Sequence, residues 1–161
     1  MTLRRAGAPS AMQFVQESFF ACPVEAVFAF HERPDAFELL QPPWERVEIV
    51  TPPRGLEVGT RVEVRAKVGP FWQTIVAEHV AYEKNQRFED VMKGGPFSHW
   101  HHKHLFFERD GGCVLRDEIE YALPGGPLGR LAARLFVARR LRRMFDYRHA
   151  VTRRELGLEP E

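Results

Sequence analysis

Residues 94–121 read GGPFSHWHHKHLFFERDGGCVLRDEIEY, in which two alternating stretches flank Asp110-Gly111-Gly112. A short Asp-Gly turn between such stretches predicts two antiparallel strands joined as a hairpin. Because successive strand side chains point to opposite faces, one row of the first strand holds Trp100, His102, His104 and Phe106. The matching row of the second strand holds Leu115, Asp117, Ile119 and Tyr121. A core made only for packing rarely contains imidazoles and a carboxylate, so this face is predicted to line a polar pocket.

The segments before this hairpin predict further strands and two short helices. Alternation indicates strands over residues 14–21, around Val47 and Ile49, and over residues 61–68, 72–83 and 87–93. In the last of these strands Phe88, Asp90 and Met92 share a face. Apolar spacing predicts one short helix from Val24 to Phe30, and a proline in the first turn predicts another from Pro34 to Leu40.

The segment after the hairpin predicts a long C-terminal helix, because the only glycine or proline between Pro127 and Gly157 is Gly129. Its apolar stripe changes side, so we expect either a bend near residues 137–139 or a separate flap hinged at Gly125-Gly126. Six consecutive strands imply an antiparallel meander, and one helix can cover only one of its faces. The predicted fold is therefore α+β, a curved antiparallel sheet gripping a long C-terminal helix around an internal cavity.

The length and composition favour a single domain. The chain has 161 residues, of which 44% are hydrophobic and 12% aromatic, enough to bury a core or enclose a cavity. We expect the domain to span residues 12–157, with a disordered extension over residues 1–11 and a short tail over residues 158–161. Met12 is an alternative start of the chain.

The charge is distributed unevenly. Residues 127–156 carry nine Arg against two acids, although the formal net charge of the whole chain is only +1. A nucleic-acid or anionic-membrane surface would give this pattern, and so would a basic helix docked on an acidic sheet. We favour the docked helix and expect no nucleic-acid partner, because the segment lacks the interleaved aromatics of single-strand binders.

The two cysteines and the lack of long apolar runs bear on the compartment. Cys22 and Cys113 form no metal-binding or redox motif, which favours a reducing environment. No apolar run reaches membrane-spanning length, so we expect no stable membrane insertion and a cytoplasmic location.

Several motifs in order resemble the START-like (SRPBCC, or helix-grip) superfamily, and within it the bacterial polyketide cyclase/dehydrase-like and lipid-transport-like branch. They are His31, Pro34, Phe37, Leu40, Pro42-Pro43-Trp44, Phe88, Asp90, Gly95-Pro96-Phe97, Trp100, His102, His104, Phe106, Leu115, Asp117, Tyr121, Leu123-Pro124, Phe145 and Tyr147-Arg148-His149. The resemblance covers about residues 14–156. It implies a helix-grip fold, which hosts carriers, sensors and enzymes alike. Relatives of this branch also occur fused to nucleoside-diphosphate-sugar-epimerase-like domains.

The histidines on the inward row admit three roles. Two imidazoles at i and i+2, completed by Asp90 or Asp117, have the spacing of a facial metal site. They also suit a satisfied buried network, or else ligand recognition or acid–base work on a carbonyl substrate. The candidate catalytic residues are His102, His104, Asp117 and Asp90. We expect no metal and no cofactor, since the fold usually binds organic ligands without one. His99 and His101, on the opposite row, are expected to face solvent.

Arg148 falls within the apolar stripe of the last helix, beside Phe145. It could form a buried ion pair with Asp90 or Asp117, extend to the edge of the stripe, or clamp a carboxylate, enolate or phenolate of a ligand. The full set of expected ligand-binding residues is Trp100, His102, His104, Phe106, Asp117, Tyr121, Phe88, Asp90, Met92, Arg148 and Phe145.

Three functions follow as hypotheses. The first is a binding or carrier protein for a small hydrophobic (aromatic, isoprenoid or acyl) molecule, held in the cavity with a few polar orienting groups. The second is a cyclase, aromatase or dehydrase using His/Asp general acid–base catalysis. The third is an auxiliary domain that works with an epimerase-like partner. The sequence leaves the oligomeric state open.

Overall fold

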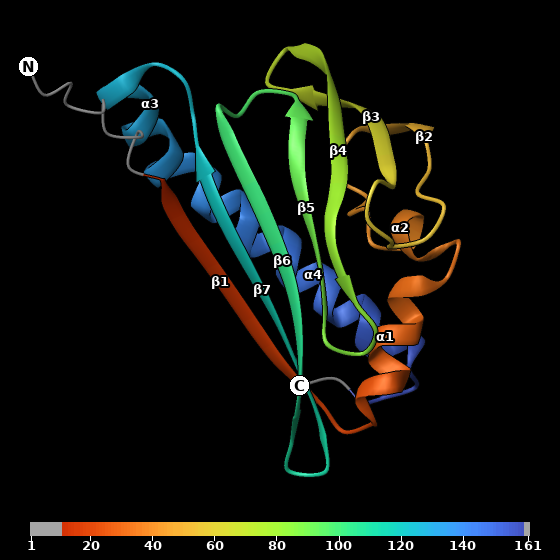
Figure 1. The fold of residues 1–161 in the computed structure, drawn as a ribbon. Coiled ribbons are helices and arrows are strands. Elements are labelled where there is room, and N and C mark those ends of the chain that lie inside the picture. Colours follow the sequence, from red (N-terminus) through yellow and green to blue (C-terminus); the bar gives the residue numbers. More distant parts are fainter. Residues whose placement is uncertain (1–10, 160–161) are drawn as a thin grey trace, which may run out of the picture.

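The computed structural model describes residues 11–159, which form one curved antiparallel sheet with a long helix against one face (Figure 1). The seven strands lie in the order β1-β7-β6-β5-β4-β3-β2. Their bounds are β1 Met12–Phe20, β2 Val47–Thr51, β3 Arg61–Val68, β4 Phe71–Glu83, β5 Arg87–Gly94, β6 His99–Arg109 and β7 Gly112–Ala122. The helices are α1 Val24–Glu32, α2 Ala36–Leu39, α3 Gly126–Ala132 and α4 Ala138–Glu155. The predicted α+β helix-grip architecture is confirmed.

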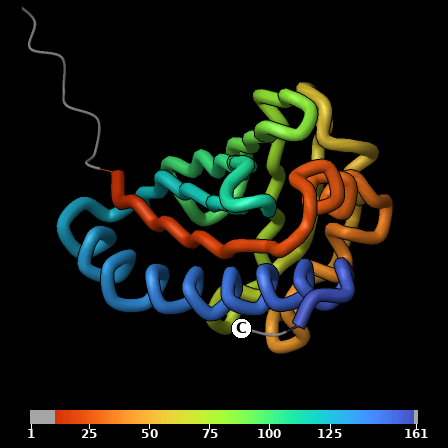
Figure 2. The backbone as a smooth tube through the Cα atoms, turned by 90° about the horizontal axis from the view of Figure 1, so that it is seen from below, coloured from red at the N-terminus to blue at the C-terminus, as the bar shows by residue number. Residues whose placement is uncertain are grey.

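Helix α4 runs along the sheet on one side, while α1 and α2 lie near its far end (Figure 2). Phe145 and Leu141 of α4 pack with Phe14, Ile119 and Tyr121 of β1 and β7. Phe28 of α1 packs against a second group, which includes Phe20, Phe88, Phe106 and Leu115. Both clusters use the inward rows that alternation predicted, so these rows form the core.

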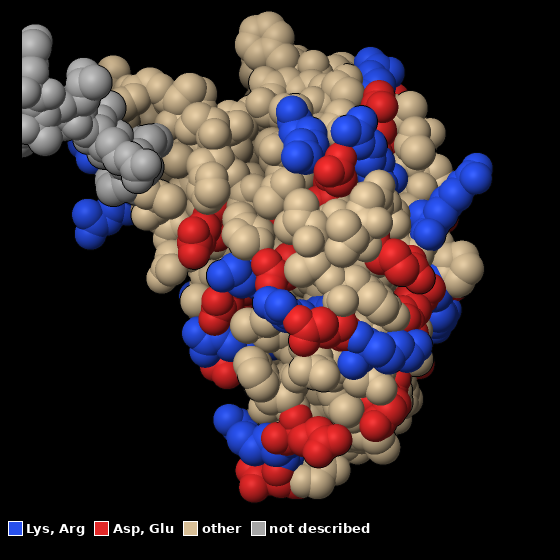
Figure 3. All heavy atoms as spheres, in the orientation of Figure 1, with Lys and Arg blue, Asp and Glu red and all other residues tan. Residues whose placement is uncertain are grey.

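The opposite face of the sheet is polar. Figure 3 shows acidic and basic side chains mixed over this side of the molecule. Arg116 of β7, for example, pairs with Glu118 on its own strand at 2.6 Å and with Glu17 of β1 at 3.2 Å. The outward row of β7 is thus a surface of paired charges.

The last helix contains a feature that the sequence did not specify. Between α3 and α4 lies a π-helical segment, Ala133–Val137. One extra residue in a turn rotates the rest of the helix by about 100°, since an α-helix has 3.6 residues per turn. The segment coincides with the change of apolar stripe and begins ahead of the predicted bend at residues 137–139, and the helix continues without a break.

The apolar residues of the first stripe do not pack against the sheet. Leu128, Leu131, Leu135 and Phe136 are 79%, 54%, 53% and 72% exposed, while Gly129 and Ala133 form the buried side. The turn before α3 uses Gly125 and Gly126 at φ +97° and +56°, a backbone conformation that favours glycine.

Other differences between the predicted and observed elements are small. Helix α2 is a single turn within the predicted Pro34–Leu40, and β1 begins two residues before Phe14.

Both cysteines are free, as expected. Among the described residues, no helix combines the length and the apolar character needed to cross a bilayer. The expected extension over residues 1–11 falls almost entirely outside the described residues.

Candidate functional site

Asp117 lies at the centre of a buried polar network between the sheet and α4. Its side chain is only 3% exposed, and its carboxylate accepts hydrogen bonds from three imidazoles. His102 Nε2 and His104 Nδ1 donate to one oxygen at 2.8 and 2.7 Å, and His149 Nε2 donates to the other at 2.7 Å. The strand register creates this arrangement, because Asp117 pairs directly with His104 and the adjacent inward pair joins Ile119 to His102.

The hydrogen bonds fix the protonation of the network. Burial alone would raise the pKa of Asp117, but the charge of His104 and the hydrogen bonds from His102, His104 and His149 lower it well below its usual value. An ionised carboxylate can only accept, so each ring nitrogen facing Asp117 carries a hydrogen. The remaining nitrogens, His102 Nδ1 and His104 Nε2, point elsewhere.

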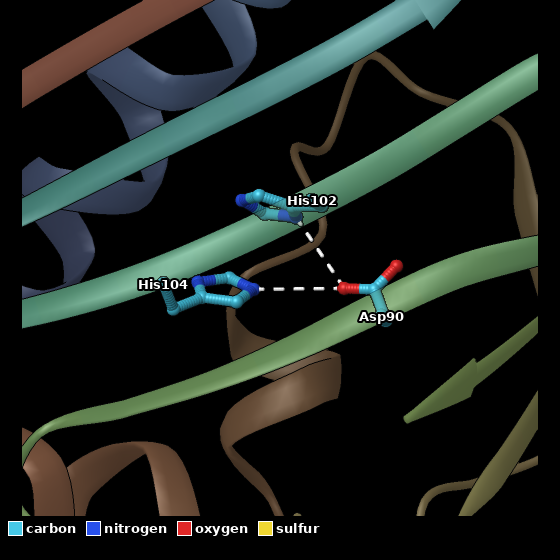
Figure 4. Close-up of side chains that lie close together, drawn as sticks. All are labelled: Asp90, His102 and His104. Atoms are coloured by element: carbon cyan, nitrogen blue, oxygen red, sulfur yellow. Dashed lines mark ion pairs between the residues drawn. The ribbon is translucent and has the colours of Figure 1, made fainter. Parts of the chain in front are cut away.

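Those two nitrogens face Asp90 of β5. One Asp90 oxygen lies 3.5 Å from His102 Nδ1 and 3.8 Å from His104 Nε2 (Figure 4). Both distances allow electrostatic attraction but are long for hydrogen bonds. Asp90 is placed here by its register with His102 across β5 and β6. The two carboxylates therefore hold the paired imidazoles from opposite sides.

The pKa values of the two imidazoles are shifted in opposite directions because their surroundings differ. Burial opposes protonation of His104, but Asp117 and Asp90 outweigh it and raise the pKa of His104. Burial and the neighbouring charge of His104 lower the pKa of His102. Burial would raise the pKa of Asp90, but His104 and His102 lower it. Protonation is thus favoured on His104 over His102, next to the two buried carboxylates.

Three buried histidines join this region without having been predicted as site residues. His149 of α4 receives a hydrogen bond from the Ser18 hydroxyl at 2.7 Å through Nδ1 and so links β1 to Asp117. His31 of α1 donates to the Val27 carbonyl at 2.8 Å, and its ring lies 6.3 Å from that of His104. His79 pairs with Asp90 across β4 and β5, and its Nδ1 is buried without a partner among the described residues. His149 and His31 belong to the motifs that carry the family resemblance, and His149 follows Phe145 by one helical turn, a signal that could have found it.

Arg148 is half-buried, and its contacts differ from the predicted buried ion pair. Its Nε donates to the Leu40 carbonyl at 3.2 Å, and its guanidinium lies 5.2 Å from the centre of the Phe145 ring. Within residues 11–159, no ion pair joins it to Asp90 or Asp117. Burial lowers the pKa of Arg148, while Asp117 and Asp90 oppose that shift from a distance. The terminal nitrogens of this cation are thus available to another group.

Aromatic rings surround the polar network. The Phe88 ring stacks on His104 at 4.0 Å, and the Phe145 ring meets His102 edge-on at 5.2 Å. Tyr121 is fully buried beside Phe97, and its hydroxyl has no hydrogen-bond partner in the described part of the chain. A buried hydroxyl without a partner is costly, so Tyr121 is an energetically unfavourable point in this part of the core.

The inward face is not equally covered along the sheet. On β7 the inward positions are all buried, whereas on β3 to β6 several remain half-exposed. These half-exposed inward residues include Val64, Ile75, Ala77, Asp90, Met92 and Trp100. Solvent therefore reaches the concave face on the side away from β7.

A hollow of about 710 Å³ lies elsewhere, along the outer side of α4. It is a groove between α4, the edge strand β1 and Trp44, and its basic residues are Arg139, Arg142 and Arg143. None of the residues predicted to bind ligand lines it. The groove is thus a second candidate binding surface, separate from the concave face.

One of the two outward histidines is less exposed than expected. His101 is about one-quarter exposed and bonds Glu89 at 2.7 Å, while Glu89 also accepts from Arg87. His99 lies 3.9 Å from Glu120 and is nearly half exposed. His99 fits the prediction of a solvated residue, but His101 belongs to a partly buried ion-pair cluster.

The curved sheet, the gripped helix and the polar network beneath it define a START-like, helix-grip protein. A family model described as "Polyketide cyclase / dehydrase and lipid transport" matches residues 21–146. Because that match covers most of the chain, the protein belongs to this family. No curated protein matches the chain.

Solved structures share the fold at low identity. TTHA0849 from Thermus thermophilus is 16% identical at a TM-score of 0.69, over 90% of this chain and 97% of that one. Norcoclaurine synthase from Thalictrum flavum is 18% identical at a TM-score of 0.63, and the match covers 97% of this chain and 96% of that one. The nucleoside-diphosphate sugar epimerase from Corynebacterium glutamicum is 23% identical at 0.64; the match covers 89% of this chain but only 29% of the epimerase. These likenesses establish the fold.

Proposed function

We propose that the protein binds and carries a small hydrophobic molecule, aromatic, isoprenoid or acyl in character, on the concave face between the sheet and α4. The observation that carries this proposal is the half-exposed inward strip on β3 to β5, where Val64, Ala77 and Met92 offer apolar surface beside Asp90. Apolar surface with a few convergent polar groups is the usual composition of a small-molecule site.

Arg148 supports a ligand with an anionic oxygen at one end. Its guanidinium is half-buried, its one protein hydrogen bond uses only Nε, and its terminal nitrogens can bind a carboxylate, enolate or phenolate in bidentate fashion. Tyr121 offers a further hydroxyl that lacks a protein partner within residues 11–159. The apolar body of the ligand would then lie along the strip, with its polar end toward α4.

Native mass spectrometry of freshly purified protein tests this proposal. We expect a bound organic molecule in the wild type and a loss of about tenfold in affinity, or roughly 1.4 kcal/mol, in Arg148→Gln. The matched control is Arg139→Gln, an exposed position on the same helix that lines the outer groove. If Arg139→Gln weakens binding and Arg148→Gln does not, the ligand occupies the groove and the proposal fails.

A second candidate is catalysis of the cyclase, aromatase or dehydrase kind. It is supported by two buried imidazoles hydrogen-bonded to one carboxylate, an arrangement that can orient a group for proton transfer at a carbonyl. Turnover of a small polyketide-like substrate, reduced roughly 10²- to 10⁴-fold by His102→Gln or His104→Gln with little change in affinity, would support catalysis over carriage.

The third candidate is an auxiliary domain for an epimerase-like partner, supported by the match to 29% of the C. glutamicum epimerase chain. Size-exclusion chromatography of this protein mixed with an epimerase-like protein from the same organism tests that role, because a functional partner should co-elute.

A further inference from the structure

Three ligating side chains on the inner face of the sheet converge on one point. They are Asp90 of β5 and His102 and His104 of β6, and one donor atom from each lies within 4.8 Å of the other two (Figure 4). The closest approaches, 3.5 and 3.8 Å from the Asp90 oxygen, exceed ordinary hydrogen-bond length. These atoms therefore lie close together without forming a hydrogen bond of ordinary length.

The tautomers imposed by Asp117 present free lone pairs to this point. His102 Nε2 and His104 Nδ1 donate their hydrogens to Asp117 in hydrogen bonds, so the lone pairs of the neutral rings lie on His102 Nδ1 and His104 Nε2. Both of these nitrogens face Asp90. In metal sites, a histidine that binds the ion through one ring nitrogen is commonly oriented by a hydrogen bond from its other ring nitrogen to a carboxylate. Asp117 forms such a hydrogen bond with each of these two rings.

From this juxtaposition we propose that Asp90, His102 and His104 form a site for a divalent transition-metal ion of the Zn²⁺, Fe²⁺ or Co²⁺ class, oriented by Asp117. Imidazole nitrogens favour these ions over Mg²⁺ and Ca²⁺, which prefer oxygen ligands. Zinc–ligand bonds of about 2.0–2.2 Å place tetrahedral ligands roughly 3.4 Å apart, close to the two distances from Asp90. Small side-chain rotations would complete the set without a change of strand register.

The site would keep at least one coordination position for another ligand. Three protein ligands with an open position are typical of catalytic rather than structural metal sites. Asp90 and His104 are only partly buried, so an ion has a route from the open side of the concave face. His79, whose Nδ1 is buried without a partner in the described chain, faces Asp90 from β4 and adds a further imidazole to this region.

The proposal is tested with the metal ions alone, on tag-free protein treated with a chelator. Binding of Co²⁺ is followed by visible absorption, and binding of Zn²⁺ is followed by calorimetry. We expect one ion per chain. Asp90→Asn should weaken binding by more than about 100-fold, because even a residue that only orients a ligand, as Asp117 does, typically contributes about 10- to 100-fold. The contacts of Asp90 with the two imidazoles are long, so Asp90→Asn should fold.

The matched control is His101→Gln, which removes an imidazole from the same strand, bonded to a carboxylate on the opposite face. It should leave the affinity for Co²⁺ unchanged, and excess Mg²⁺ should not displace the ion. The proposal is overturned if the wild type binds neither ion in a 1:1 ratio, if Asp90→Asn binds Co²⁺ as tightly as the wild type, or if His101→Gln weakens binding as much as Asp90→Asn. Circular dichroism of each variant confirms that a loss reflects the site and not unfolding. Because no organic ligand takes part, these results are independent of the carrier proposal.

Discussion

Replacing Asp117 by Asn should destabilise the protein strongly, because one carboxylate serves three buried imidazole donors. The amide has only one acceptor oxygen, and its NH₂ group would face at least one ring N–H. A hydrogen bond to a charged group is worth about 1.5–3 kcal/mol, and breaking a buried charge pair costs roughly 3–5 kcal/mol. We therefore expect a loss of about 3–5 kcal/mol in the free energy of unfolding, or roughly 6–20 °C in melting temperature for a chain of this size.

The assay is denaturant unfolding of Asp117→Asn, His102→Phe and the double variant. Because His102 donates directly to Asp117, the two changes should be non-additive, with a coupling of at least about 1 kcal/mol. The control is Asp146→Asn, the same substitution at an exposed carboxylate of α4 bonded to Gln16, which should change stability by less than about 0.5 kcal/mol. A loss below about 1 kcal/mol in Asp117→Asn, or additive single variants, would refute the view of Asp117 as the centre of a coupled network.

Three further results are expected. Tyr121→Phe should leave stability unchanged or raise it by up to about 1 kcal/mol, since it removes a buried hydroxyl without a partner in the described chain; a clear loss in thermal denaturation would mean that the hydroxyl is satisfied. Ser18→Ala should cost about 1 kcal/mol in chemical denaturation, because it leaves the Nδ1 acceptor of buried His149 unpaired, and an unchanged midpoint would contradict that bond. Burial lowers the pKa of His31, which lies near His104, Asp117 and His149, to about 4, whereas the unfolded chain binds this proton below about pH 6.5. As the pH falls from 6.5 to 4, the free energy of unfolding of the wild type should therefore fall by up to roughly 3 kcal/mol more than that of His31→Gln. Parallel curves of stability against pH for the two proteins would count against a neutral buried His31.

The hairpin at residues 94–121 shows what strand alternation can predict. Alternation fixes which side chains share a face, and the turn at Asp110-Gly111 fixes the register, so the placement of Asp117 on one face with His102 and His104 followed from sequence, while the choice between Asp117 and Asp90 as their hydrogen-bond partner did not. Alternation also placed Asp90 on the inward face, and β5 pairs with β6 without a register shift, so Asp90 lies opposite His102.

The features that were missed depend on interruptions of periodicity or on packing between distant elements. A bulge in β4 between His79 and Ala81 puts both His79 and Tyr82 on the inner face, which strict alternation forbids. The π-helical segment Ala133–Val137 rotates α4 relative to α3 in the same way. The bond from His149 to Asp117 joins a helix to a strand, and no local pattern specifies how the helix is turned against the sheet.

The direct test of the central claim, that the concave face binds a small hydrophobic molecule, is an amide NMR titration with an aromatic carboxylate and its methyl ester. We expect chemical-shift changes clustered at Val64, Ala77, Asp90 and Met92 and at Arg148, with the acid binding about tenfold more tightly than the ester because of the guanidinium. Shifts confined to the outer groove around Val15 and Arg139, or no saturable shifts with either compound, would contradict it.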